Sequence, residues 1–250
     1  TYRRLISEAP QSVDNPDYQH EIAMAYHKIG KRQQALDEVD KLRKEYGKAS
    51  AWSRANASEQ DAIKAADKLI EKDLRKLAVD YHNQAKKYGK GRQASETYSL
   101  AESAYRMYLN EYPSNSHSYE VNYAYGELLY KLKKYDKAFD QYMLVVKLDP
   151  KGKHSKFCAE SSIFAAEKMV KAEGGGKAIK AKPGDSKDPQ PLTQWEQNLV
   201  DSCKQYATLY PEEKKVKNII YRSAYLLYNK YRFDEAAEQF NAVIKMDPSS

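Results

Sequence analysis

Five histidines and two cysteines are the side chains of this 250-residue sequence that first suggest catalysis or metal binding. His20 and His27 are seven residues apart, so they share one face of a predicted helix. About 10 Å of helix rise separates them, which is too far for both to hold one ion. No HExxH, paired CxxC or facial-triad spacing occurs in the sequence. We therefore predict no metal site, no catalytic residues and no cofactor.

Glycine-rich motifs that bind phosphate or activate a serine are also missing from the sequence. It contains no GxxxxGK[ST], no GxSxG, and no GxGxxG after a predicted strand. The triplet Gly174-Gly175-Gly176 lacks the flanking strand and helix that a phosphate loop requires. We interpret the triplet as part of a flexible linker, and we predict that the segment is not an enzyme.

The two cysteines leave two alternatives open. Cys158 and Cys203 fall on facing sides of one predicted antiparallel helix pair. In an oxidising compartment a disulfide would join them across the pair. The alternative is two buried free thiols that act as small apolar residues.

The charge of the chain would permit an anionic partner. Lys and Arg number 42 against 35 Asp and Glu, which gives a net charge of +7. The two signs alternate along nearly every predicted helix, and no long run of one sign occurs. We therefore predict a solvated helical surface rather than a dedicated nucleic-acid face. A nucleic-acid-binding helical repeat stays an alternative, as does the regulatory arm of an enzyme whose catalytic domain lies outside this segment.

Pairs of amphipathic helices must position any functional residue in this chain. The clearest pair spans residues 118–150, and a polar break with an N-cap at Asp136 separates its helices. Apolar and small residues recur at helical spacing on one face of each helix: Tyr125, Gly126, Leu129, Leu132, then Ala138, Tyr142, Val145, Leu148. Two helices with so short a connection pack antiparallel and leave an apolar edge for the next pair.

These residues carry a family resemblance. Gly126, Ala138, Tyr142 and Pro150 occupy the spacing of the tetratricopeptide repeat, so the sequence resembles that family. Small residues let the two helices approach at their crossing, and the proline sets the turn into the next pair. Asn122 stands where the family has a tryptophan. The resemblance implies an all-α, right-handed α-α superhelical solenoid of about five antiparallel pairs.

We expect a single array over residues 1–250, with pairs at about 17–47, 58–113, 116–150, 154–211 and 214–248. The second pair has a long front half, which is either one extended helix or two helices that meet near Asp73. Residues 173–193 are rich in Gly and Pro and predict a flexible insertion loop. We also expect a longer natural chain, beginning before Thr1 and continuing after Ser250.

Proteins of this family bind extended peptides or partner helices on a concave wall built by the first helix of each pair. The 22 tyrosines suit such a wall, because a tyrosine offers flat apolar area and a hydrogen-bonding tip. The family's carboxylate-clamp pattern is not matched in successive pairs. The repeat frame assigns partner-binding positions to His20, Met24, His27, Tyr123, Glu127, Tyr130, Tyr221, Tyr225 and Tyr228.

No apolar run approaches 18 residues and no signal peptide opens the segment, so we predict no membrane span in it. The tyrosine-rich pairs, the long second pair and the insertion resemble bacterial cell-envelope scaffolds of outer-membrane or motility assemblies. This resemblance favours a periplasmic or outer-membrane-associated protein and leaves the cytoplasm open. The partner is expected to be a protein or peptide, and the sequence does not predict the oligomeric state.

Overall fold

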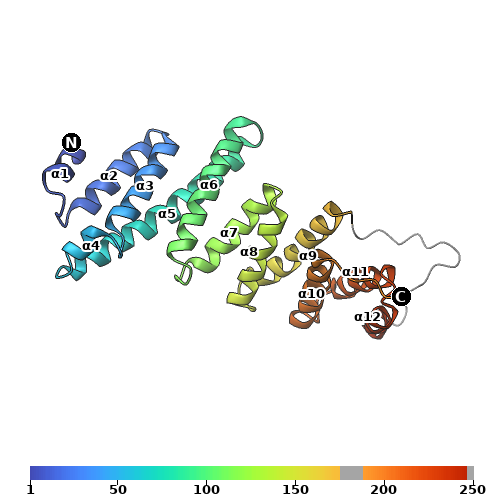
Figure 1. The fold of residues 1–250 in the computed structure, drawn as a ribbon. Coiled ribbons are helices and arrows are strands. Elements are labelled where there is room, and N and C mark those ends of the chain that lie inside the picture. Colours follow the sequence, from blue (N-terminus) through green and yellow to red (C-terminus); the bar gives the residue numbers. More distant parts are fainter. Residues whose placement is uncertain (175–187, 247–250) are drawn as a thin grey trace. The chain divides into compact units, whose positions relative to one another are not determined.

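Helices form all the regular secondary structure of the computed structural model, which describes residues 1–174 and 188–246 (Figure 1). No strand occurs in those residues. The chain divides into two compact units, Thr1–Val121 (unit 1) and Asn122–Ser250 (unit 2). Successive helices pack on one another within each unit. The expected all-α, tetratricopeptide-like fold class is confirmed.

Unit 1 contains two antiparallel helix pairs, α2 with α3 and α5 with α6. Two short helices accompany them, α1 ahead of the first pair and α4 between the pairs. In chain order the bounds are α1 (Tyr2–Glu8), α2 (Asn15–Lys28), α3 (Arg32–Tyr46), α4 (Ala51–Ala55), α5 (Gln60–Tyr88) and α6 (Arg92–Glu111).

The long front half of the second pair is one continuous helix. α5 has 29 residues and passes through Asp73 without a break. Leu74, Leu77 and Tyr81 on its inner face are fully buried. This apolar stripe extends along the helix, so packing rather than intrinsic propensity holds α5 together.

Trp52 closes the space between α4 and the chain that precedes α2. Its indole nitrogen donates a 2.9 Å hydrogen bond to the carbonyl oxygen of Ser12, and its ring meets Tyr46 edge-on. Trp52 is buried. The side chain of Ser50 caps α4 by accepting a hydrogen bond from the backbone of Ser53.

Unit 2 continues the pattern from α7, which begins just before the boundary between the units. The bounds are α7 (Ser118–Lys131), α8 (Tyr135–Leu148), α9 (Ser155–Ala172), α10 (Gln194–Leu209), α11 (Val216–Asn229) and α12 (Phe233–Met246). α7 and α8 approach closely at Gly126, because a Cβ there would lie 2.9 Å from the ring of Tyr142. The proposed N-cap at Asp136 is wrong. Lys134 holds that position, and Asp136 lies inside the first turn.

The turn inside a pair has the same form in three places. Gly30, Lys133 and Tyr231 all have positive φ, at 76°, 60° and 58°. The residue after each of them donates its backbone N–H to a carbonyl five residues earlier, which is the bond of a Schellman-type helix end. The repeat is therefore encoded in the backbone of the turns even where the residue is not glycine.

The described parts of the insertion lie at its two ends. Thr193 begins α10 with a capping box, in which its hydroxyl and the carboxylate of Glu196 bond each other's backbone N–H groups. Gln190 donates its backbone N–H to the carbonyl of Lys230, 2.8 Å away. The predicted flexibility of the loop concerns mainly residues 175–187, which lie outside the described residues, as do Pro248 and the end of the fifth pair.

Candidate partner-binding face

Two histidine–aspartate pairs join the first helices of unit 1. His20 Nδ1 lies 2.6 Å from Asp73 Oδ2, and His27 Nε2 lies 3.1 Å from Asp80 Oδ2. The histidines are seven residues apart on α2 and the aspartates seven apart on α5. The pairs therefore form a ladder whose two rungs are about 10 Å apart along the helices.

Burial makes the first rung the more consequential of the two. Asp73 is fully buried, and no hydrogen-bond partner for its Oδ1 occurs among the described residues. The hydrogen bond from His20 raises the pKa of that imidazole against the opposing effect of burial. At the second rung Asp80 is partly exposed and also accepts from Lys76 Nζ at 2.9 Å. The carboxylate of Asp73 thus depends on one histidine for its charge compensation.

Two of the predicted partner-binding residues, His20 and His27, belong to this ladder. The imidazoles of His20 and His27 are bonded to α5, and Met24 between them is half-buried. These three side chains present less free polar surface than their positions alone would suggest.

Aromatic contacts join α7 to its neighbours in unit 2. The ring of Tyr123 stacks on His154 with centroids 3.8 Å apart, and it meets Phe157 edge-on at 5.8 Å. Glu127 accepts a 2.5 Å hydrogen bond from the hydroxyl of Tyr142. Tyr130 packs edge-on against Tyr135. The predicted binding residues of α7 are therefore half-buried and engaged with neighbouring side chains.

A second charged ladder joins α9 to α11. Lys215 Nζ lies 2.6 Å from Glu160, and Arg222 lies 2.8 Å from Glu167. The glutamates are again seven residues apart on α9, and the cations are seven apart, with Lys215 at the N-cap of α11 and Arg222 within α11. The guanidinium of Arg222 also lies over the ring of Phe164, 5.4 Å from its centroid.

Two hollows open between α9 and α11 along this ladder. The first has a volume of about 230 Å³ and lies against Phe164, Asn218 and Ile219. The second has a volume of about 340 Å³ and lies against Val170, Tyr225 and Leu226. Arg222 lines both. The exposed ion pairs therefore bridge the two helices without filling the space between them.

Three tyrosines form a stripe on α11. Tyr221, Tyr225 and Tyr228 are 51%, 48% and 52% exposed. The rings of Tyr221 and Tyr225 stack with centroids 6.3 Å apart. Tyr221 also rests on Phe240, and Tyr228 on Phe233. One side of each ring is packed and the other is open, which is the arrangement of a preorganised contact surface.

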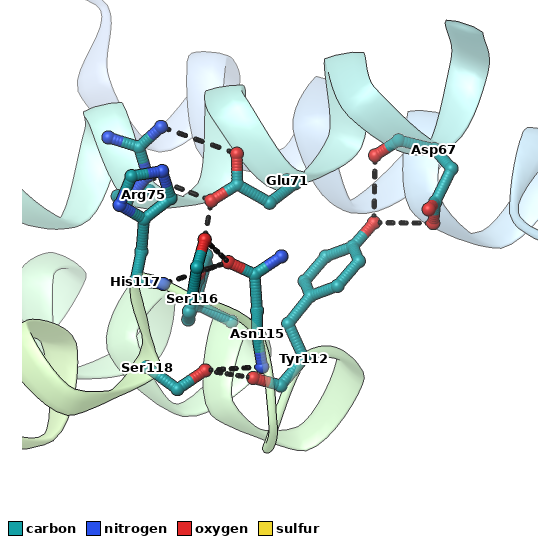
Figure 2. A network of polar contacts seen from close by, with 9 residues as sticks. Asp67, Glu71, Arg75, Tyr112, Asn115, Ser116, His117 and Ser118 are labelled. Carbon is teal, nitrogen blue, oxygen red and sulfur yellow. Dashed lines mark hydrogen bonds and ion pairs between the residues drawn. The ribbon is translucent and has the colours of Figure 1, made fainter. Parts of the chain in front are cut away.

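A polar network in unit 1, shown in Figure 2, was not predicted. Glu71 on α5 accepts hydrogen bonds from Arg75 at 2.8 Å and from the hydroxyl of Tyr108 at 2.9 Å. Burial would raise the pKa of Glu71, but these bonds outweigh it and lower the pKa. The hydroxyl of Tyr112 donates to Asp67, and Asn115 Oδ1 accepts from Tyr108 and from the backbone of His117. The network fastens the chain after α6 to α5.

The two cysteines are buried and free, so the disulfide alternative is not formed in this structure. Burial raises the pKa of both thiols to about 12. Their electrostatic neighbours differ: Cys158 lies near Glu127, whereas Cys203 lies near Glu167 and Arg222. Both behave as small apolar side chains of the core.

Neither a metal cluster nor a membrane span is found in the part of the chain that the structure describes. No group of three or more His, Cys, Asp or Glu side chains there could hold an ion. No described helix is long and apolar enough to cross a membrane.

Most of the residues that line the α9–α11 junction were not predicted from the sequence. Tyr225 was predicted, but Glu160, Glu167, Lys215 and Arg222 were not. A signal was present, because each ladder repeats a seven-residue spacing on both of its helices. Spacing alone does not indicate which two helices face each other. The acidic positions can therefore be matched with their basic partners only in the folded structure.

Residues 119–151 match the model of the family described as tetratricopeptide repeat. The matched segment is the α7–α8 pair and its exit turn, with Gly126 against Tyr142 at the crossing. A search of curated proteins finds no match to this chain.

Proposed function

Because residues 119–151 form a tetratricopeptide repeat, a unit that generally mediates protein interactions, we propose that this chain is a non-catalytic scaffold that binds an extended protein segment. The proposed surface is the first-helix face of unit 2. We define it by three residues each from α7, α9 and α11: Tyr123, Glu127, Tyr130, Glu160, Phe164, Glu167, Tyr221, Tyr225 and Tyr228.

The observation that carries this proposal is the pair of hollows between α9 and α11. A bound segment needs concave apolar space with a few polar groups beside it to fix its orientation. The hollows supply Ile219, Leu226 and Tyr225 as apolar area, with Asn218 and Arg222 as donors. Tyrosine and arginine side chains contribute disproportionately to binding energy at protein interfaces.

The histidine ladder gives unit 1 a smaller part in the proposal. His20, Met24 and His27 hold the equivalent face of α2, but both imidazoles already bond to α5. Less of their polar surface is therefore free for a partner. We assign the main recognition to α9 and α11.

The ion pairs of the α9–α11 junction argue against the nucleic-acid alternative. Lys156, Lys215 and Arg222 are each paired with a glutamate, so the positive charge of these three side chains is already compensated. A phosphate backbone needs cations that it can neutralise itself. Weak retention on heparin at physiological salt would agree with this reasoning, and steep salt-dependent oligonucleotide binding would contradict it.

We also propose a bacterial envelope setting, in an outer-membrane or motility assembly. The support is the tyrosine-rich composition, the 29-residue α5 and the insertion after α9. The full reading frame tests this setting. A signal peptide followed by a lipidation cysteine would support it, and a leaderless frame would count against it.

The binding proposal is tested with peptides selected on the intact chain from a displayed random library. The variant Tyr221→Ala/Tyr225→Ala/Tyr228→Ala should weaken a selected peptide at least about tenfold, because three half-exposed rings leave the surface. Its helicity and melting temperature should change little.

The matched control is Leu144→Ala/Leu148→Ala on α8, which removes exposed apolar area from a second helix. This control should bind like the wild type. Failure to select any peptide, or equal losses in both variants, would contradict the proposal. A large fall in melting temperature for the tyrosine variant would mean that the rings belong to the core.

A further inference from the structure

One wall of the second hollow contains a hydrogen-bond donor with no acceptor. Asn229 is 8% exposed, and no described residue accepts from its Nδ2. A buried amide donor without a partner costs on the order of 1–3 kcal/mol. Asn229 closes the end of α11 and lines the hollow, but its Nδ2 is itself buried. A ligand in this space therefore supplies the missing acceptor once the side-chain amide turns toward the hollow.

The remaining lining is largely apolar and comes from three helices. Val170 of α9, Leu199 of α10 and Leu226 of α11 form its inner part, and Tyr225 flanks it. The volume of about 340 Å³ accommodates one bulky side chain together with the adjoining main chain. An apolar side chain placed here leaves the carbonyl of its own residue to meet Asn229.

Two charged side chains of α9 that line the hollow, Glu167 and Lys171, differ in their ion pairing. Glu167 is paired with Arg222. Lys171, one turn further along α9, also lines the hollow, is exposed, and forms no ion pair with any described residue. An acidic side chain next to the apolar one would complement Lys171 without breaking the existing pair.

We propose that the second hollow is an anchor site for an internal partner segment in which a bulky apolar residue is followed, within two positions, by Asp or Glu. The apolar side chain fills the space between Val170 and Leu226. Its backbone carbonyl accepts from Asn229 Nδ2, and the carboxylate pairs with Lys171. This inference rests on the proposed function, because it names the chemistry of one subsite on the same face.

The experiment uses a random peptide library displayed through its C-terminal end, so that no selected peptide has a free carboxyl terminus. Peptides selected on the intact chain should share an apolar residue followed by Asp or Glu. Asn229→Asp replaces the amide donor by an acceptor of the same shape and should weaken the best peptide about tenfold. Lys171→Gln should weaken it about three- to fivefold and reduce its salt dependence.

Matched controls separate the site from the fold. Lys168→Gln removes an exposed cation from the same helix three residues earlier and should leave affinity unchanged. Replacing the acidic residue of the peptide by its amide should cost the wild type about three- to fivefold and the Lys171→Gln variant nothing, since the two changes remove one interaction. Replacing the apolar residue by Ala should cost about tenfold on an unaltered protein.

The outcomes distinguish this inference from the proposed function. Peptides that respond to the α11 tyrosine variant but not to Asn229→Asp or Lys171→Gln would overturn the anchor site and leave the binding face standing. A strict need for a free C-terminal carboxylate in synthetic peptides would also overturn it, because the site is assigned to an internal segment. Failure to select any peptide would overturn both proposals.

Discussion

The α2–α5 junction of unit 1 and the α9–α11 junction of unit 2 are both bridged by two acid–base pairs, but the side chains of the two junctions differ in length and in burial. Both join first helices of successive pairs through two rungs seven residues apart. Unit 1 uses short side chains, and the carboxylate of Asp73 is fully buried. Unit 2 uses long side chains, and that of Lys215 is 62% exposed. Short buried rungs hold two helices together, whereas long exposed rungs leave hollows that a partner can occupy.

Removing the buried histidine should have the largest effect on this comparison. His20→Leu leaves the carboxylate of Asp73 buried without a cation and should lower the stability of unit 1 by about 3 kcal/mol. Urea titration followed by fluorescence measures it. The two tryptophans lie one in each unit, so Trp195→Phe leaves Trp52 to report on unit 1 alone.

The double variant His20→Leu/Asp73→Leu is the control for that loss. Replacing both charges by apolar groups should restore most of the stability. If the free energy of unfolding of His20→Leu lies within about 0.5 kcal/mol of the wild-type value, His20 does not stabilise the buried Asp73. The contrast between the two junctions would then disappear.

His27→Leu should cost less, about 1 kcal/mol, because Asp80 is partly exposed and keeps Lys76 as a second partner. The same Trp52 reporter measures the difference. A loss as large as that of His20→Leu would show that burial does not rank the two rungs.

The pH dependence of unit 1 follows from the raised pKa of His20. A group whose pKa is higher in the folded state adds stability that is complete below its unfolded pKa and is lost as pH rises through the folded value. The stability of unit 1 should therefore fall between about pH 6.5 and the higher folded pKa. This pH-dependent loss of stability should be smaller than the loss caused by His20→Leu, and the His20→Leu variant should not show it. An unchanged pH profile in His20→Leu would assign the titration to another group.

The smallest effect is expected at the exposed ladder. Lys215→Ala should change the stability of unit 2 by no more than about 0.5 kcal/mol, because exposed ion pairs contribute little. Trp195 in a Trp52→Phe background reports on unit 2. A cost above about 2 kcal/mol would contradict the description of this junction as loosely bridged.

The sequence predicted the repeat well because its determinants are local. Gly126, Ala138 and Tyr142 each act within one helix pair, so their spacing carries the whole signal. The continuity of α5 through Asp73 was left open, since nothing in the local pattern separates one long helix from two. The N-cap at Asp136 was misplaced because α8 begins two residues earlier than predicted, with Lys134 at the N-cap.

The candidate site was only partly predictable. Tyr221, Tyr225 and Tyr228 follow from the repeat frame and the helical period. The partners Asp73 and Arg222 do not, because their roles depend on which helix of a neighbouring pair they face. Asn229 is the least predictable of these residues. Its Nδ2 lacks an acceptor because of the residues that surround it in the fold, and no spacing in the sequence indicates that.

Hydrogen exchange with and without a peptide selected on the intact chain tests whether a partner binds at the α9–α11 junction. Added protection is expected in α9 and α11, with α2 and α5 exchanging at the same rate in both states. Protection concentrated on α2 and α5, or confined to second helices such as α8 and α12, would contradict the claim that the open junction of unit 2 is where a partner binds.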